Sequence, residues 1–238
     1  MERDYASLQS GYRSEAALSQ SFLSNVFAWM FAGLLMTSIV SYLFAANDNL
    51  LSLLYNESGR TMLGYIVLFA PIGFVLLMSL GINKFSYVTL IVLFMSYAAL
   101  MGMSLSFIFM LYTSSSIFST FAISAGMFGV MAIYGYTTKT DLTKMGNILM
   151  MALVGIIIAS LVNFFLKSGM MSYIISLISV VIFTGLTAYD VQKLKRIGTG
   201  VEYGSEAAGK LSIMGALSLY LDFINLFLAM LRLFGNRK

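Results

Sequence analysis

Residues 85–138 read FSYVTLIVLFMSYAALMGMSLSFIFMLYTSSSIFSTFAISAGMFGVMAIYGYTT, and none of these 54 positions carries a charge. A helix that crosses a bilayer needs about 20 apolar residues, so this stretch has room for two such helices. The polar cluster YTSSS at residues 112–116 marks the turn between them. The stretch therefore predicts a pair of transmembrane helices joined by a short connection.

The same criterion applied to the rest of the chain predicts an all-α integral membrane protein with seven transmembrane helices. Continuous apolar runs without alternation of period two favour helices over a membrane barrel. The expected spans are residues 22–46, 61–83, 87–111, 117–137, 146–166, 170–191 and 211–233. The polar residues 1–20 are expected to form a cytoplasmic tail, and residues 21–238 a single membrane domain. The glycine-rich residues 197–210 are expected to form a loop.

Composition excludes several classes of function. Of the 238 residues, 59% are hydrophobic and 10% are charged, whereas soluble proteins carry about 25% charged residues. The chain has no Cys and no His, which excludes thiol chemistry, serine–histidine triads and His-based metal sites. We therefore expect no enzyme activity and no bound cofactor. The net charge of +4 lies in short connections between apolar runs, so it does not indicate nucleic-acid binding.

The distribution of Lys and Arg predicts a cytoplasmic N-terminus, because basic residues are enriched in cytoplasmic loops. With that orientation, nine basic residues lie inside: Arg3, Arg13, Lys84, Lys139, Lys144, Lys193, Lys195, Arg196 and Lys210. Five lie outside: Arg60, Lys167, Arg232, Arg237 and Lys238. The basic C-terminus does not fit this pattern. Either it is translocated at a cost, or the last segment does not span fully.

Two smaller features predict helix packing. Ala122, Gly126 and Gly129, and likewise Gly155 with Ala159, place small residues at helical spacing, which allows helices to approach closely. Asn163 lies within the fifth expected span and is interpreted as an interhelical hydrogen-bonding residue rather than a ligand.

Two acidic residues, Asp190 and Asp222, lie within or at the edge of expected spans, while the other eight lie in tails or loops. An acid at membrane depth costs at least ~2.5–3.5 kcal/mol and is therefore a candidate functional residue. The two flank the last helical hairpin, and their midpoint, (190 + 222)/2 = 206, falls in its most turn-like stretch. Residues equidistant from such an apex lie at equal height, so the two carboxyls are expected to face each other.

Two buried carboxylates close together cannot both ionise cheaply, so they would share a proton and act as a proton sensor. When both are ionised, they would offer a hard oxygen site for a cation such as Ca²⁺. Nearby oxygens that could support the pair belong to Tyr189, Ser218, Tyr220 and Asn225. Two alternatives stay open: Asp190 could pair with Lys193 or Lys195 at the interface, and Asp222 could be a purely structural hydrogen-bonded residue.

Four segments resemble the Bax inhibitor-1 family, also called the transmembrane BAX-inhibitor-motif proteins, and most closely its bacterial inner-membrane branch. They are GYTTKTDL (Gly135–Leu142), NILMMALVGIIIASLVNFF (Asn147–Phe165), GLTAYDVQKLK (Gly185–Lys195) and ALSLYLDFINLFLAMLRLFGNRK (Ala216–Lys238). The resemblance covers essentially the whole chain. It implies seven helices with the last one enclosed by the other six, and a location in the bacterial inner membrane.

The resemblance also implies a function, namely a pH-sensitive calcium leak in which Asp190 and Asp222 are the proton-sensing pair. Family members can carry a basic residue that latches the closed state at the cytoplasmic end of the second helix. Here the candidate latch is Lys84, which stands somewhat later than that position, and the matching stretch has no arginine. Some bacterial relatives interact with a membrane-bound ATP-dependent protease, so a regulator of other membrane proteins is the alternative. A proton-coupled transporter would need an inverted repeat, which the sequence does not show.

Overall fold

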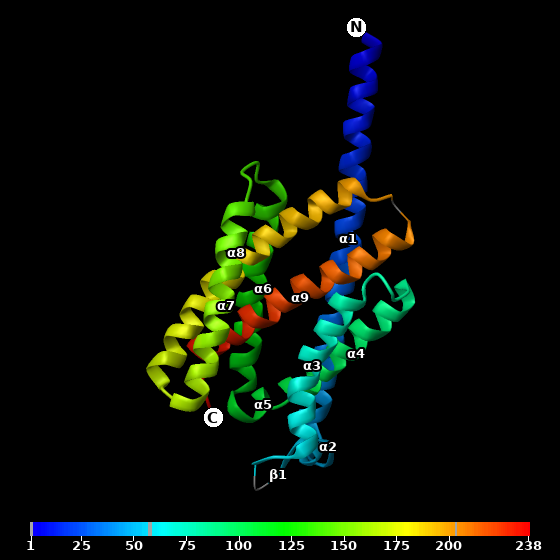
Figure 1. The fold of residues 1–238 in the computed structure, drawn as a ribbon. Helices are drawn as coiled ribbons and strands as arrows, with labels where there is room; N and C mark the ends of the chain where they lie inside the picture. Colours follow the sequence, from blue (N-terminus) through cyan, green and yellow to red (C-terminus); the bar gives the residue numbers. More distant parts are fainter. Residues whose placement is uncertain (1, 57–58, 203) are drawn as a thin grey trace. The chain divides into compact units, whose positions relative to one another are not determined.

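The computed structural model describes residues 2–56, 59–202 and 204–238. It is 86% helical and contains seven helical segments that are long and apolar enough to cross a membrane, which confirms the expected fold class (Figure 1). The long helices are α1 (Glu2–Ala46), α3 (Met62–Gly81), α4 (Tyr87–Leu105), α6 (Ser114–Thr137), α7 (Thr143–Leu166), α8 (Gly169–Gly200) and α9 (Glu206–Phe234). The short α5 (Ile108–Leu111) extends the α4 span to Leu111.

Hydroxyl side chains cap the N-termini of several of these helices. Thr61 accepts a hydrogen bond from the backbone of Gly64 at the start of α3, and Ser86 does the same for Thr89 at the start of α4. Thr113 accepts from Ser116 at the start of α6, within the polar cluster that the sequence predicts as a turn. Such caps satisfy backbone N–H groups that have no partner inside the helix.

A short connection joins α1 to α3. It consists of α2 (Asp48–Leu54) and the strands β1 (Tyr55–Asn56) and β2 (Gly59–Arg60). The strands pair antiparallel, with Tyr55 opposite Arg60. Gly59 has a φ of 112°, a conformation that favours glycine.

The chain divides into two units, and each is described by itself. Unit 1 comprises residues 1–106 and Lys193–Leu217, which include α1 to α4, the end of α8 and the start of α9. Unit 2 comprises Phe107–Gln192 and Ser218–Lys238, which include α5 to α7, most of α8 and the rest of α9.

In unit 1, α1 packs against α4, and α3 also contacts α4. The Thr37 hydroxyl donates to the carbonyl of Ala98 at 2.8 Å, which links α1 to α4 in the buried interior. The Asn25 amide donates to the Ser212 hydroxyl at 3.1 Å and links α1 to α9. Such hydrogen bonds between helices add directional contacts to the packing of α1 against α4 and α9.

In unit 2, α6, α7 and α8 pack through close contacts. The backbone of α6 at Gly135 approaches α8 so closely that a Cβ at this position would lie 2.2 Å from the carbonyl oxygen of Ala188. The Asn163 amide donates to the Ser172 hydroxyl at 2.7 Å, which confirms the predicted interhelical hydrogen bond between α7 and α8.

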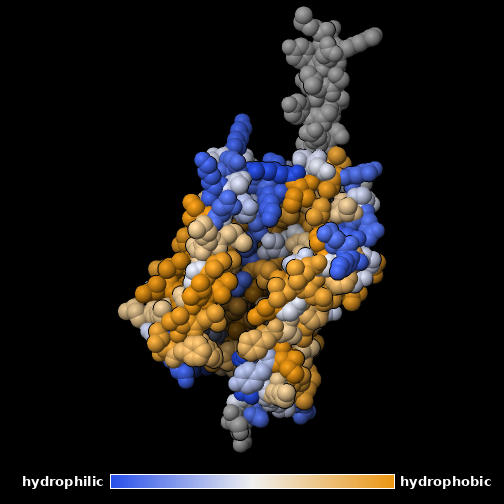
Figure 2. Space-filling view, viewed as in Figure 1, coloured by the Kyte–Doolittle hydropathy of each residue, from blue (hydrophilic) through white to orange (hydrophobic). Residues whose placement is uncertain are grey.

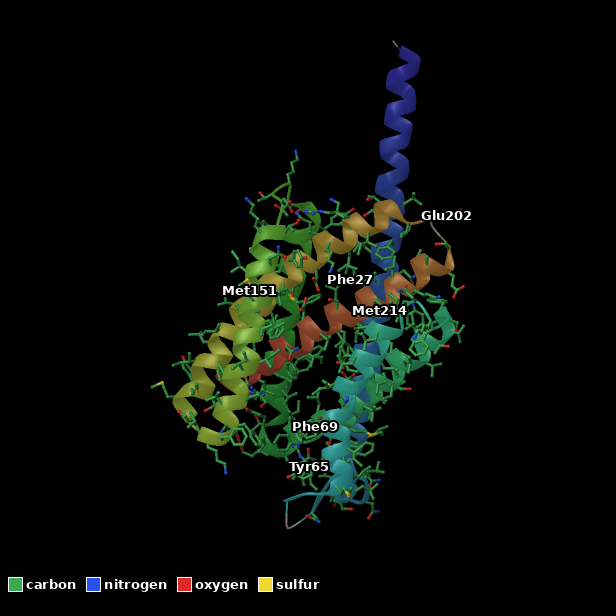
Figure 3. All side chains as sticks on the ribbon, viewed as in Figure 1. Phe27, Tyr65, Phe69, Met151, Glu202 and Met214 are labelled. Atoms are coloured by element: carbon green, nitrogen blue, oxygen red, sulfur yellow. The ribbon has the colours of Figure 1, made fainter. Side chains whose placement is uncertain are left out.

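The helices differ in the share of their residues that is buried. In α9, 72% of the most apolar window is buried, against 6% in α7 and at most 33% in the other spans. Figure 2 shows hydrophobic side chains over the flanks of the helices and hydrophilic ones near their ends. The labelled side chains Tyr65 and Phe69 of α3 and Met151 of α7 are among the exposed apolar residues (Figure 3). Such flanks suit lipid, and α9 is the helix most shielded from it.

Three expectations need revision. Residues 197–210 are largely helical rather than a loop, because Ser205 caps α9 and Glu206 forms an i,i+4 ion pair with Lys210 at 3.0 Å. Helix α1 begins at Glu2, so residues 2–17 continue the helix of the first span, which starts at Leu18. Among the described residues, a Cβ at Gly126, Gly129 or Gly155 would meet no atom within 4 Å, so the close approach expected at these glycines is wrong.

Candidate functional site

Asp190 of α8 and Ser218 of α9 meet inside unit 2. The Ser218 hydroxyl donates a hydrogen bond to the Asp190 carboxylate oxygen Oδ2. Asp190 is half-buried, and this contact joins the two helices of the last hairpin. Hydrogen bonds from a hydroxyl favour the ionised form of a carboxylate.

Asp222 lies four residues after Ser218, on the same face of α9 and about 6 Å further along its axis. Its side chain is buried, with 5% of the residue exposed. Its oxygen Oδ2 has no hydrogen-bond partner among the residues that the structure describes. Unit 2 therefore holds two acids about one helical turn apart in height, one with a hydroxyl partner and one buried with an oxygen that lacks a partner in the described residues.

The sequence predicts that Asp222 lies opposite Asp190, because the two residues are equidistant from the expected apex of the hairpin. In the structure, Ser218 occupies that position. The hydrogen bond centres the hairpin at (190 + 218)/2 = 204, close to Gly204, whose φ is 81°. The offset arises because α9 begins at Glu206 and the turn between the helices ends before it. Asp222 is thus about one helical turn beyond the position opposite Asp190.

Gln192 positions α8 next to Asp190. Its side-chain oxygen accepts from the backbone N–H of Leu142 at 2.9 Å, and its amide nitrogen donates to the carbonyl of Thr140 at 2.8 Å. Both partners lie in the connection between α6 and α7. Since the Gln192 side chain is buried, these two bonds hold α8 against that connection.

Aromatic rings position α9 on the side of Asp222. Phe121 of α6 contacts Phe223 edge-on at a centroid distance of 5.2 Å and Phe227 at 5.8 Å. Phe128, two turns further along α6, contacts Phe223 at 5.6 Å. Edge-to-face pairs of this kind are favourable beyond the area that they bury. They fix the segment of α9 that carries Asp222 against α6.

The other predicted residues are placed as follows. The Tyr189 ring covers Gly146 of α7, where a Cβ would lie 2.3 Å from the ring. Tyr220 is fully buried on α9. The Asn225 amide donates to the carbonyl of Leu221 at 2.8 Å, within its own helix. Lys84 lies in the exposed turn after α3 in unit 1, where its backbone N–H donates to Gly81 at 2.8 Å. Among the four supporting groups, Ser218 donates a hydrogen bond to a carboxylate, that of Asp190.

A permanent metal centre would need more ligands than the pair provides. Ca²⁺ takes six to eight oxygen ligands. Within the described part of the chain, no group of three or more Asp, Glu, His or Cys side chains gathers anywhere. The pair suits transient contact with a cation better than a closed, resident site.

A cavity of about 400 Å³ lies in unit 1, between α1, α4, the end of α8 and the start of α9. Asn25, Tyr87 and Glu206 are among its lining residues, and neither aspartate is. The concave surface of unit 1 and the acidic pair of unit 2 are therefore separate features.

Sequence reasoning does not identify Gln192 as a residue of the site. Its two partners lie 50 and 52 positions earlier in the chain. One signal is present, because a glutamine two residues after Asp190 is a polar side chain near the end of an apolar run. Its partners could not be predicted without the packing of α6, α7 and α8.

Comparisons with known proteins agree over nearly the whole chain. The sequence model of the family described as "Inhibitor of apoptosis-promoting Bax1" matches residues 19–238. The inner membrane protein YbhL of Escherichia coli strain K12 is 48% identical over 220 residues, which are 92% of this chain and 93% of that protein. An uncharacterized protein of Borreliella burgdorferi is 44% identical over 226 residues, or 95% and 96% of the two chains. An uncharacterized protein of Rickettsia prowazekii is 43% identical over 217 residues, or 91% and 90%.

Proposed function

The chain belongs to the Bax inhibitor-1 family, and on that premise we propose that it is a pH-sensitive calcium leak channel of the bacterial inner membrane. Asp190 and Asp222 are the proton-sensing pair. The observation that carries the proposal is the burial of Asp222 one helical turn beyond Ser218, the residue that donates a hydrogen bond to Asp190. No resident cofactor is required, and Ca²⁺ is the transported ion.

The physical basis is the cost of charge in an apolar interior. Two like charges in a medium of low effective dielectric repel strongly, and each also loses hydration. Such a pair holds a shared proton at low pH and loses it as the pH rises. Proton loss doubles the charge at a site between α8 and α9.

Deprotonation has two effects that favour conduction. It adds repulsion between the carboxyls of α8 and α9, which opposes the closed packing of the two helices. It also creates a doubly negative oxygen site that attracts a hard divalent cation. Flux therefore rises as the pair deprotonates. Lys84 is a candidate for the basic group that stabilises the closed state.

The proposed topology has the N-terminus in the cytoplasm and seven complete spans. The backbone N–H of Thr113 donates to the carbonyl of Asn236 at 3.1 Å, and that of Lys238 donates to Leu111 at 3.0 Å. The C-terminus and the connection between α5 and α6 therefore lie at the same end of unit 2, as a complete last span requires. With this topology, that end faces away from the cytoplasm.

The test is Ca²⁺ flux into liposomes that contain the purified protein, measured between about pH 5 and 8, a range over which a proton-sharing pair titrates. The parent should show flux that rises with pH. Asp222→Asn, which keeps the shape of the side chain but not its charge, should show flux that does not depend on pH. Asp48→Asn, at an exposed carboxyl at the start of α2, should behave like the parent. If Asp222→Asn titrates like the parent, the pair is not the sensor.

The outcome also decides between the proposal and its alternative. If the pure protein conducts no Ca²⁺ at any pH, the regulator of other membrane proteins becomes the better proposal. Its partner would be a membrane protein such as a membrane-bound ATP-dependent protease. That function predicts co-purification of a partner in stoichiometric amount.

A further inference from the structure

Three buried hydroxyls follow one face of α6. Ser116, Thr120 and Ser124 stand four residues apart, and each is at most 6% exposed. Residues at this spacing lie above one another on a helix, so the three form a row roughly 12 Å long. This hydroxyl row belongs to unit 2, as do Asp190 and Asp222.

Ser124 differs from three buried hydroxyl residues of the neighbouring helix, although Thr184 of α8 likewise has a buried hydroxyl without a partner in the described residues. On α8, Ser176, Ser179 and Thr187 each donate to the carbonyl four residues earlier, at 2.7 to 2.9 Å. Ser124 is fully buried, and across residues 2–56, 59–202 and 204–238 its oxygen has no hydrogen-bond partner. A hydroxyl in an apolar interior needs such a partner. The position therefore suits a mobile polar species, either water or a hydrated cation.

The row lies on the side of α6 that contacts α9. Phe121 and Phe128 bracket Ser124 in sequence, and both rings contact Phe223 of α9. Ser124 is within about 60° of both phenylalanines around the helix. Asp222 precedes Phe223 on α9, and it also has an oxygen with no partner in the described chain. Each of the two helices in contact thus carries a buried oxygen without a partner among the described residues.

The other end of the row is bound by the C-terminus of the chain. The backbone N–H of Asn236 donates to the Ser116 hydroxyl at 2.9 Å. Around this bond, Lys238 Nζ donates to the carbonyl of Phe109 at 2.8 Å, and Arg237 lies over the ring of Tyr112 at 6.0 Å. We call residues Gly235–Lys238 the C-terminal strap. Its terminal residues 236–238 are exposed and held by polar contacts, which water can replace more easily than a packed apolar contact.

We propose that the hydroxyl row of α6 lines an aqueous route for cations through unit 2, and that the C-terminal strap closes this route at Ser116. The inference rests on the proposed leak function and specifies the part of the route beyond the aspartate pair. Hydroxyl oxygens can replace some of the water around a hard cation. They bind it weakly, and conduction requires sites weak enough for the ion to leave.

The absence of cysteine from the sequence makes the route directly testable. Ser124→Cys introduces the single thiol of the chain at the end of the row opposite Ser116. Ser179→Cys is the matched control, because Ser179 is also buried but donates to the Ile175 carbonyl of its own helix. The protein is reconstituted in liposomes and exposed to a small, water-soluble, cationic methanethiosulfonate, and the rate of thiol modification is measured by mass.

The strap is tested in the same background. Deletion of residues 236–238 removes it, and Asn236→Pro removes only the N–H that donates to Ser116. Either change should raise the modification rate of Ser124→Cys at least about tenfold, since a closed state held by a few hydrogen bonds leaves the open state a tenth populated or less. Ser179→Cys should stay unmodified with and without the strap. Ca²⁺ flux of the strap variants should rise in parallel.

Each result has one meaning. An unmodified Ser124→Cys after strap removal overturns the route, as does equal modification of Ser179→Cys. Modification of Ser124→Cys that is fast and unchanged by either strap variant overturns the closure. Because modification does not depend on Ca²⁺, it also separates the two proposals. A reactive Ser124→Cys in a protein without Ca²⁺ flux would support the aqueous route and refute the calcium leak.

Discussion

The Ser218 hydroxyl donates a hydrogen bond to the Asp190 carboxylate, one helical turn before Asp222 on the same face of α9. The two aspartates are thereby unequal. Asp190 has a donor that favours its charged form, and Asp222 is buried with an oxygen that lacks a partner in the described residues. The two members of the proposed proton-sensing pair therefore differ in their surroundings, and they are expected to contribute differently to its titration.

Ser218→Ala should move the pH dependence of Ca²⁺ flux. Removal of the donor disfavours the charged state of the pair, so the midpoint of the flux curve should shift to higher pH by about one unit, the equivalent of one hydrogen bond to a charged group. Ser218→Thr keeps the hydroxyl and should leave the midpoint in place. An unchanged midpoint in Ser218→Ala would show that this bond does not tune the sensor.

Gln192→Leu should destabilise the folded protein. The substitution leaves the N–H of Leu142 and the carbonyl of Thr140 without their partners, and an unsatisfied buried group costs about 1–3 kcal/mol. Thermal unfolding in detergent should therefore start at a lower temperature than in the parent. Gln20→Leu, at an exposed position of α1, serves as the control. An equal loss of thermal stability in both variants would show that the two Gln192 hydrogen bonds do not stabilise the fold.

Two glycines of α6 should respond oppositely to alanine. At Gly135 a Cβ would lie 2.2 Å from a backbone oxygen of α8, which cannot move aside as a side chain can. Gly135→Ala should therefore cost about 1–3 kcal/mol of stability, as overpacking does. Gly129→Ala meets open space among the described residues and should be neutral or stabilising by up to ~1 kcal/mol, because alanine favours helix. Thermal unfolding of the two variants side by side tests the contrast.

The proposed topology predicts which single thiols react from outside. Asn56→Cys lies in the connection between the first two spans, and Ala207→Cys lies at the start of α9. A maleimide that cannot cross membranes should label Asn56→Cys in cells with an opened outer barrier and an intact inner membrane. Ala207→Cys should be labelled only after the inner membrane is permeabilised. The reverse pattern would place the N-terminus outside.

The sequence was sufficient to predict the seven spans, because the length of a charge-free run alone determines whether a helix can cross a bilayer. It predicted the ends of α8 and α9 less well. Glycines at residues 198, 200, 204 and 209 suggested a loop over residues 197–210, yet Ser205 and the Glu206–Lys210 ion pair start α9 within that stretch. Short-range capping outweighed composition there.

Both aspartates could be identified from sequence because a charge at membrane depth is costly. Their neighbours could not all be identified in this way. Ser218 and Asn225 look equivalent as polar residues near Asp222, but the Asn225 amide donates to Leu221 of its own helix whereas Ser218 reaches α8. The direction of a side chain around a helix and the partners of Gln192 depend on packing between segments far apart in the chain. A spacing rule along one helix does not contain that information.

The hydrogen bonds of Gln192 determine which of the two helices of the proposed sensor, α8 or α9, stays in place. The side-chain amide of Gln192 forms hydrogen bonds with the main chain at both Thr140 and Leu142. Helix α8 can therefore neither rotate about its axis nor shift by one residue without losing both bonds. Helix α9 contacts α6 in unit 2 through edge-on rings, and it contacts α8 through the Ser218–Asp190 hydrogen bond. In the proposed sensor, the α8 carboxyl would therefore be the fixed reference point. A change of charge would displace α9, and Asp222 would move with it.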